Sequence, residues 1–151
     1  GGGLALTLAL KLKQNKLPQP GCLFLISPWI NKSKDSASHL SQFAVDPVIN
    51  ESWSLQMAHN YLQDSEAIKS EACLVDKELN GLAPVLIHVG TDEVLLDDSL
   101  LLKQKAIKAG VHVKLITYKE LWHVFHFSAS LFAVARNALK HAGEYIASQL
   151  K

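Results

Sequence analysis

The chain carries at residues 84–90 the stretch PVLIHVG, in which only the histidine has a polar side chain. A continuous apolar run of this length is typical of a strand buried on both faces, as in a parallel sheet with helices above and below. A second run, GCLFLIS, occupies residues 21–27, and a third, VHVKLITY, occupies residues 111–118 and alternates enough to leave one face less buried. We therefore predict three strands, at about 22–27, 84–90 and 111–118.

Helical patterns lie before, between and after the predicted strands. Ala- and Leu-rich residues 4–16 predict a buried helix before the first strand, and a helix capped by Asn50 or Ser52 precedes the second. Residues 97–110 begin with two aspartates and end with glycine, which is typical of a helix with negative charge in its first turn. An amphipathic pattern over residues 128–150 predicts the last helix.

This alternation of strand and helix predicts an α/β fold with parallel strands, right-handed crossovers and helices on both faces. Three strands are few for such a sheet, because a parallel sheet needs cover on both faces. One edge therefore lacks a neighbour, and we expect self-association through that open edge.

The composition argues against several classes of protein. With 151 residues, 48% of them hydrophobic and 19% charged, the chain is long enough for one ordered domain. Its 15 Lys and Arg against 14 Asp and Glu give a net charge of +1 and no concentrated basic patch, which argues against nucleic acid as a partner. The two cysteines lack CxxC spacing, so we expect reduced thiols, a cytoplasmic location, and no metal or cofactor. The apolar residues 4–12 are too short for a membrane span, which needs about 20 residues, and they lack the features of a signal peptide.

Two polar loops follow the second and third predicted strands. The first is GTDE at residues 90–93, and the second is ELWHVFH at residues 120–126. Because the carboxyl ends of parallel strands meet at one edge of a sheet, this is where an open α/β sheet builds its site. An acid that precedes a histidine along the chain suggests two members of a nucleophile–His–acid triad.

The residues of these loops leave alternatives open. Asp92 competes with Glu93, Asp97 and Asp98 as the acid, and the helix dipole accounts for negative charge at a helix start. A histidine between aromatic residues, as His123 is, more often packs than catalyses.

Four motifs resemble one known family. They are SPW at residues 27–29, DPV at 46–48, VGTDEVLLDD at 89–98 and WHVFH at 122–126. In this order they resemble the C-terminal half of an α/β-hydrolase of the hormone-sensitive-lipase group, nearest to bacterial esterases and lactone hydrolases with a GxDEVLLDD segment. The resemblance covers essentially the whole chain. It implies a serine carboxylic-ester hydrolase that acts on a small ester or lactone through an acyl-enzyme.

Carried over residue by residue, the resemblance makes Asp92 the triad acid and His123 the general base and acid. His126 is the second candidate for the base. In many relatives Pro follows the triad Asp, whereas this chain has Glu93 there.

The resemblance also suggests where the nucleophile lies. In the family the elbow reads Gly-Asp-Ser-Ala-Gly, followed by more glycines and an Ala- and Leu-rich helix, and GGGLAL at residues 1–6 matches the segment directly after Ser-Ala. Residues 1–151 are then the C-terminal half of one hydrolase domain, and the serine stands two residues before Gly1. Gly1 and Gly2 are expected near the oxyanion hole, and the chain alone is expected to be inactive.

Two other classes of function compete with this hypothesis. The first is a non-catalytic α/β module that binds a partner or assembles through its open sheet edge. The second, a nucleotide-binding domain, is disfavoured because no GxGxxG follows a predicted strand.

Overall fold

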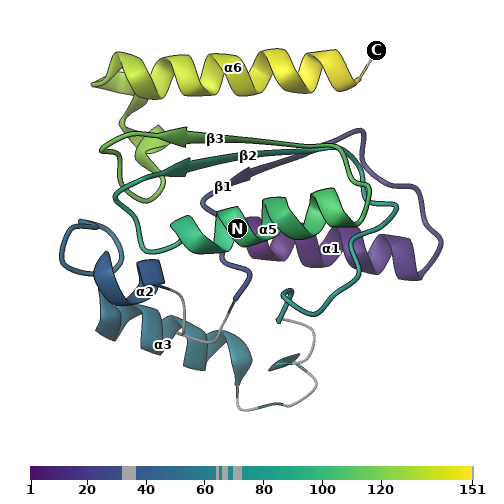
Figure 1. Cartoon of the computed structure of the whole chain (residues 1–151), viewed down its shortest axis with the longest axis horizontal. Coiled ribbons are helices and arrows are strands. Elements are labelled where there is room, and N and C mark those ends of the chain that lie inside the picture. Colours follow the sequence, from purple (N-terminus) through teal and green to yellow (C-terminus); the bar gives the residue numbers. More distant parts are fainter. Residues whose placement is uncertain (32–36, 64, 66–67, 70–72, 151) are drawn as a thin grey trace.

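The computed structural model describes residues 1–31, 37–63, 65, 68–69 and 73–150. Its sheet consists of β1 (Leu23–Ile26), β2 (Val85–Gly90) and β3 (Val113–Tyr118), which lie side by side in chain order and are all parallel (Figure 1). The three predicted strands and their parallel arrangement are thus confirmed.

Helices cover both faces of the sheet, as predicted. On one face lie α1 (Gly2–Gln14) and α5 (Leu96–Lys108), and on the other lies α6 (Ala133–Gln149) (Figure 1). The short α2 (Ala37–Ser41) and the longer α3 (Glu51–Leu62) lie on the side of α1 and α5, toward the end to which the strands point (Figure 1).

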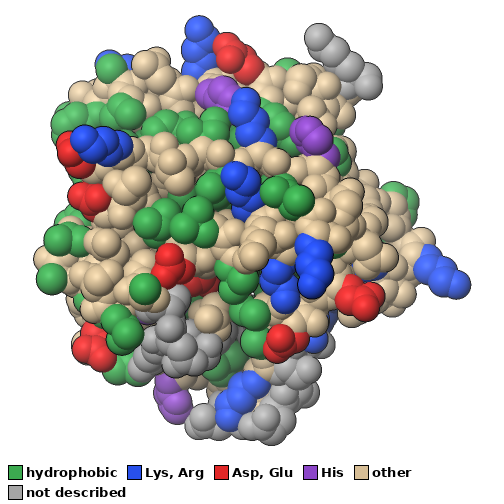
Figure 2. All heavy atoms as spheres, viewed as in Figure 1, with side chains coloured by type: hydrophobic (Ala, Val, Ile, Leu, Met, Phe, Trp, Pro, Cys, Tyr) green, Lys and Arg blue, Asp and Glu red, His purple; other side chains and the backbone are tan. Residues whose placement is uncertain are grey.

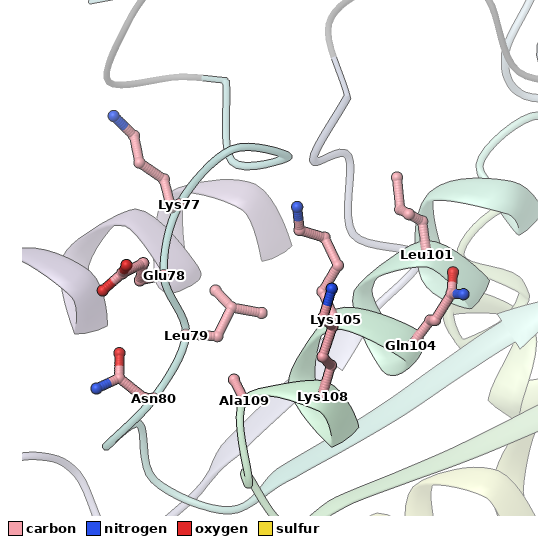
Figure 3. A pocket seen from close by; sticks show the side chains of 9 residues that line it. All are labelled: Lys77, Glu78, Leu79, Asn80, Leu101, Gln104, Lys105, Lys108 and Ala109. Carbon is pink, nitrogen blue, oxygen red and sulfur yellow. The ribbon is translucent and has the colours of Figure 1, made fainter.

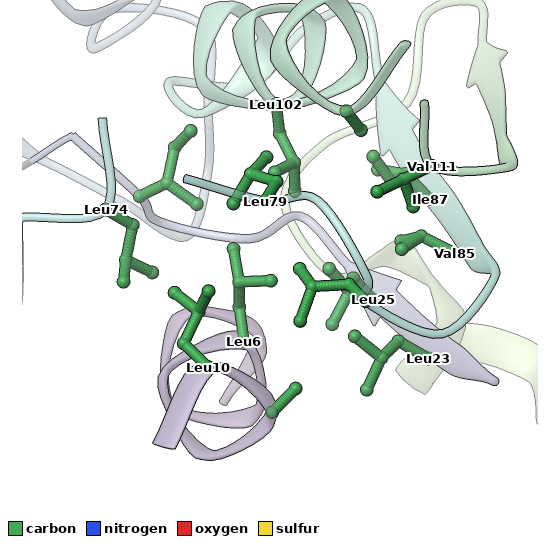
Figure 4. Packing of buried hydrophobic residues seen from close by; sticks show 14 residues of the cluster. Leu6, Leu10, Leu23, Leu25, Leu74, Leu79, Val85, Ile87, Leu102 and Val111 are labelled. Atoms are coloured by element: carbon green, nitrogen blue, oxygen red, sulfur yellow. The ribbon is translucent and has the colours of Figure 1, made fainter. Parts of the chain in front are cut away.

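Alternating strand residues build the core on the two faces. Leu25 and Ile87 point to the face of α1 and α5, whereas Phe24 and Leu86 belong to a cluster that includes Tyr145 of α6. Full burial of one such leucine stabilises the fold by roughly 1.5–3 kcal/mol. Labelled in Figure 4 are ten members of the larger cluster: Leu6, Leu10, Leu23, Leu25, Leu74, Leu79, Val85, Ile87, Leu102 and Val111.

Local signals account for the start of α3 and for both ends of α5. The Asn50 side chain caps α3 by accepting a hydrogen bond of 2.9 Å from the Trp53 N–H, which decides between Asn50 and Ser52. Helix α5 has Asp97 and Asp98 in its first turn, and after it Gly110 adopts φ +72°, a conformation that costs glycine little.

Two elements differ from the expectation. The last helix was predicted from residue 128, but residues Phe125–Ser130 form a 3-10 helix (η1) and α6 begins at Ala133. A local apolar pattern does not separate a 3-10 helix from an α-helix. Phe125 of η1 and Ala135 of α6 are both buried in one cluster. The first helix is buried on one side only, because Leu4 and Leu8 are exposed.

In the described part of the chain, no helix is long and apolar enough to cross a bilayer. Within the same residues, no group of three or more His, Cys, Asp or Glu is arranged to hold a metal ion. Cys22 and Cys73 are both free.

A row of three histidines, His88, His126 and His141, runs under α6. His88 is fully buried at the centre of β2, where its Nδ1 lies 3.1 Å from His126 Nε2 and its Nε2 lies 3.4 Å from His141 Nδ1. At the outer end, Lys114 Nζ lies 3.1 Å from His141 Nε2. The Tyr118 hydroxyl also faces the row, 3.4 Å from His88 Nδ1.

The contacts of this histidine row fit one set of donors and acceptors. The Lys114 ammonium can only donate, so His141 accepts at Nε2 and donates from Nδ1 to His88. His88 then donates from Nδ1 to His126. A second proton on His88 would sit on Nε2 and face the N–H of His141.

The surroundings of the row therefore oppose charge. Burial, with His126, His141 and Lys114 nearby, lowers the pKa of His88 from 6.5 to about 3. Burial lowers the pKa of His126 from 6.5 to about 4.

We predict that acid destabilises the fold through these two groups. Below pH 6.5, His88 and His126 bind protons in the unfolded chain but stay unprotonated in the folded chain. The free energy of unfolding is therefore highest above about pH 6.5 and falls toward pH 4. The slope is at most about 1.4 kcal/mol per pH unit for each histidine. Urea unfolding at a series of pH values measures it.

The double variant His88→Leu/His126→Leu should lose most of this slope, because neither group is left to titrate. The control is His112→Gln, since His112 is exposed. An unchanged slope in the double variant would show that other groups cause the acid sensitivity.

Candidate active site

The loops that follow β2 and β3 meet at one edge of the sheet. The Thr91 N–H donates to the Tyr118 carbonyl (2.9 Å), and the Asp92 N–H donates to the Leu121 carbonyl (3.0 Å). A methyl group on Gly90 would overlap the Leu121 carbonyl, so only glycine allows this approach. The two polar loops are therefore held against each other, as their positions after parallel strands predict.

The structure brings His123 together with Glu93. Glu93 Oε1 lies 3.5 Å from His123 Nδ1, and the Glu93 side chain is fully buried while that of His123 is 15% exposed. The distance is long for a hydrogen bond, yet neither atom has a hydrogen-bond partner in the described part of the chain. Such contacts are often long in the absence of substrate and tighten in the reacting complex.

The second carboxylate oxygen of Glu93 is held by two donors. Oε2 accepts a hydrogen bond of 2.7 Å from the Ser27 hydroxyl and one of 2.9 Å from the Gly90 N–H. Ser27 is itself buried and follows β1 directly. Two donors on one oxygen leave the other oxygen directed at the imidazole.

Asp92, the acid named from the sequence, lies elsewhere. Its Oδ1 accepts a hydrogen bond of 2.9 Å from the Thr91 hydroxyl, and no contact with a histidine is found for it among the described residues. The geometry thus favours Glu93 over Asp92 as the partner of His123. The one signal in the sequence was that Glu93 departs from the Pro of many relatives.

The other carboxylates near this edge serve the backbone. Asp98 Oδ1 accepts from the N–H groups of Ile30 (2.7 Å) and Asn31 (2.6 Å). Asp97 Oδ2 accepts from the Ser38 N–H (2.8 Å). These aspartates therefore fix the segment after β1 and the start of α2, a role beyond the helix dipole that the sequence suggested.

His126, the second candidate for the base, does not reach the Glu93 carboxylate. It is buried in the histidine row, where its Nε2 contacts His88. Of the two histidines in this loop, only His123 has a carboxylate partner among the described residues.

The backbone around the site is strained at three points. Ser27 (φ +45°), Glu120 (φ +58°) and Val124 (φ +49°) all adopt the left-handed conformation without being glycine. For a β-branched residue such as Val124 this is unusual, and each such residue costs roughly 1–3 kcal/mol. Strain of this kind clusters at functional sites, and these three residues flank Glu93 or His123.

The N-terminus of α1 lies at the same edge. Gly1 is the N-cap of α1, and a methyl group on Gly2 would come within 2.9 Å of Pro28, the residue after Ser27. Gly1 and Gly2 are thus brought near the segment that holds Glu93.

A pocket of about 350 Å³ opens beside this helix end. Trp29, Trp53 and Met57 line it, and Phe43 packs in a neighbouring cluster. The whole lining is Gly1, Gly3, Leu4, Thr7, Trp29, Trp53, Met57 and Tyr61.

We predict that Gly90→Ala destabilises the protein by roughly 1–3 kcal/mol or more, because the methyl group forces the two loops apart. The matched control is Gly143→Ala in α6, where a methyl group meets nothing within 4 Å. That change should be neutral or stabilising by up to about 1 kcal/mol. Urea unfolding measures both, and equal stabilities of the two variants would contradict the close approach at Gly90.

Similarity to known proteins was found along the whole chain. A family model described as the α/β hydrolase fold matches residues 1–127. An acetyl-hydrolase of Streptomyces hygroscopicus is 33% identical over 146 residues, which are 97% of this chain and 49% of that protein. An esterase of Acinetobacter venetianus is 32% identical over 149 residues, covering 98% of this chain and 49% of that protein.

Solved structures agree with these matches. A bacterial esterase of the hormone-sensitive-lipase family has a TM-score of 0.94 at 29% identity, covering 100% of this chain and 51% of that chain. An esterase/lipase from an uncultured bacterium has a TM-score of 0.92 at 34% identity, covering 99% of this chain and 50% of that chain. The chain therefore spans about half the length of the relatives it matches.

Proposed function

The chain belongs to the α/β-hydrolase fold family, and from this premise we propose that the complete protein is a serine carboxylic-ester hydrolase. In this proposal, residues 1–151 are the C-terminal half of one hydrolase domain and supply the acid and the base of its triad. The observation that carries the proposal is the contact between Glu93 Oε1 and His123 Nδ1 at the carboxyl edge of the sheet.

The proposed acid is Glu93, in place of Asp92. A carboxylate as fully buried as Glu93 must be compensated, and its three neighbours are the Ser27 hydroxyl, the Gly90 N–H and the His123 ring. This arrangement holds the proton of neutral His123 on Nδ1 and leaves Nε2 to act on a nucleophile.

The nucleophile would come from sequence outside these 151 residues. In the described part of the chain, no hydroxyl or thiol makes a hydrogen bond to His123. A serine there would lose its proton to His123 Nε2 as its oxygen attacks the ester carbonyl, and the imidazolium would then protonate the leaving alcohol. Water would release the acid from the acyl-enzyme in a second round of the same proton transfers.

The proposed substrates are small esters or lactones with an apolar part. The pocket beside Gly1 has a mainly apolar and aromatic lining, which suits an acyl or alcohol chain of a few carbons. Gly1 and Gly2 would stand near the oxyanion hole, where the start of α1 favours negative charge.

The first prediction is that the 151-residue chain alone does not hydrolyse p-nitrophenyl acetate or butyrate, since it lacks the activated serine. Expression of the same reading frame extended upstream of Gly1 should give turnover. Turnover by the isolated chain that requires His123 would contradict a nucleophile outside it. An extended protein without esterase activity would favour the non-catalytic binding module.

The second prediction separates the two candidate acids in the extended protein. His123→Ala and Glu93→Gln should each lower kcat by roughly 10³- to 10⁴-fold, because the proton transfer fails or the imidazolium is no longer stabilised. Asp92→Asn, which makes the same change one residue away, should leave kcat within about threefold, since the Asp92 carboxylate accepts a hydrogen bond from the Thr91 hydroxyl and contacts no histidine in the described part of the chain. The reverse pattern would restore Asp92 as the acid.

A further inference from the structure

A second pocket lies far from this site, at the opposite end of the sheet. Its volume is about 580 Å³. It lies between the last turns of α5 and the loop at residues 77–80 that leads to β2 (Figure 3). Since the strands are parallel, the start of β2 and the end of α5 mark the edge opposite to Glu93 and His123.

Positive charge gathers at this pocket, which we name the lysine groove. Its walls carry Lys77, Lys105 and Lys108, and Glu78 is the one carboxylate among its described lining residues. Figure 3 shows the Glu78 side chain directed away from Lys105 and Lys108. Figure 2 shows basic side chains close together on the face that carries α5. The whole chain has a net charge of only +1, whereas residues 103–108 alone carry three lysines.

Within the residues that the structure describes, the three ammonium groups have no carboxylate partner. The ion pairs found there involve Lys119, His123 and Lys140, and none involves a lysine of the groove. The dipole of α5 accounts for lysines in its last turn. Lys77 comes from a separate loop, and Figure 3 shows its side chain directed away from Lys105 and Lys108. Lys105 and Lys108 lie in the last turn of α5, and an anion between their like charges would relieve the repulsion between them.

The wall of the groove is held in place from below. Lys13 Nζ of α1 donates to the Glu78 carbonyl (3.1 Å) and to Asn80 Oδ1 (2.8 Å). Leu79 is buried in the core between these two residues. The loop is therefore fixed before any ligand arrives, and preorganisation of this kind lowers the cost of binding.

The floor of the groove is apolar. Leu79, Leu101 and Ala109 line it beneath the lysines. A ligand that fits both parts has a multiply charged head and a carbon skeleton. Lysine binds phosphate as a point charge, without the paired geometry of arginine. A phosphate monoester carries about −1.5 to −2 charges near neutral pH, which the ammonium groups of Lys105 and Lys108 match.

We propose that the lysine groove binds the phosphate group of an organic phosphate monoester, with the carbon skeleton against Leu79, Leu101 and Ala109. Such a head group occurs both in soluble phosphate esters and in phosphatidic acid. The site is independent of the hydrolase chemistry, because it lies at the other end of the sheet and shares no residue with it.

The test titrates the 151-residue chain with phenyl phosphate in low-salt buffer at pH 7.5, using calorimetry. Phenyl sulfate has the same ring with a single charge, and inorganic phosphate has the charge without the ring. We expect phenyl phosphate to bind at least about tenfold more tightly than either. Added NaCl should weaken binding, since a surface charge is screened over about 10 Å at 0.1 M salt. Equal affinity for all three ligands would overturn the proposal.

The variant Lys105→Gln/Lys108→Gln should weaken phenyl phosphate binding at least about tenfold. Its control, Lys119→Gln/Lys140→Gln, makes the same change in net charge at exposed lysines outside the groove. Circular dichroism checks that both variants keep the fold. Equal losses in the two variants would mean attraction to net charge alone and would overturn the proposal.

Vesicles distinguish the two sources of the phosphate group. One set contains phosphatidylcholine alone, and the other contains phosphatidylcholine with an equal amount of phosphatidic acid. Sedimentation with the second set only, lost in Lys105→Gln/Lys108→Gln, would identify a lipid head group. Phenyl phosphate binding without sedimentation would identify a soluble ester.

Discussion

The parallel pairing of β2 with β1 on one side and β3 on the other is the constraint on which the site depends. All six residues of β2 are buried, so the strand has no freedom to shift toward solvent. Its register with β3 joins Gly90 to Tyr118 and thereby fixes where both following loops begin. A one-residue slip would turn every side chain of β2 to the other face.

The buried carboxylate of Glu93 then dictates the arrangement of its neighbours. An unpaired charge in such a position would cost several kcal/mol, and the strand ends supply its partners, with Ser27 directly after β1, Gly90 at the end of β2 and His123 after β3. The left-handed conformation of Ser27 fits this account, because the hydrogen bond to Glu93 requires one direction of the Ser27 hydroxyl. One charge thus ties the ends of all three strands together.

Polar groups are accommodated in this small fold in three different ways. Glu93 is buried with donors around it, whereas His88 and His126 are buried in surroundings that lower the pKa of each imidazole. The lysines of the groove stay near solvent, where mutual repulsion is weak enough to be tolerated. The local access of water decides how each group is accommodated. Glu93 lies at the carboxyl edge of the sheet, the histidines lie on its α6 face and the lysines lie at its amino edge.

The sequence by itself determined the three strands, the helices on both faces and the two polar loops, because apolar runs and helix caps are local signals. It also limited the candidate base to two histidines of one loop, His123 and His126, and the structure places only His123 beside Glu93 among the described residues. The choice of Glu93 over Asp92 was decided by tertiary structure, because adjacent residues in a turn point in different directions and only the partners Ser27 and His123 distinguish them. The lysine groove was decided in the same way. Lys77 and Lys105 are 28 positions apart in the sequence, and the crossover between β2 and β3 brings them to one hollow.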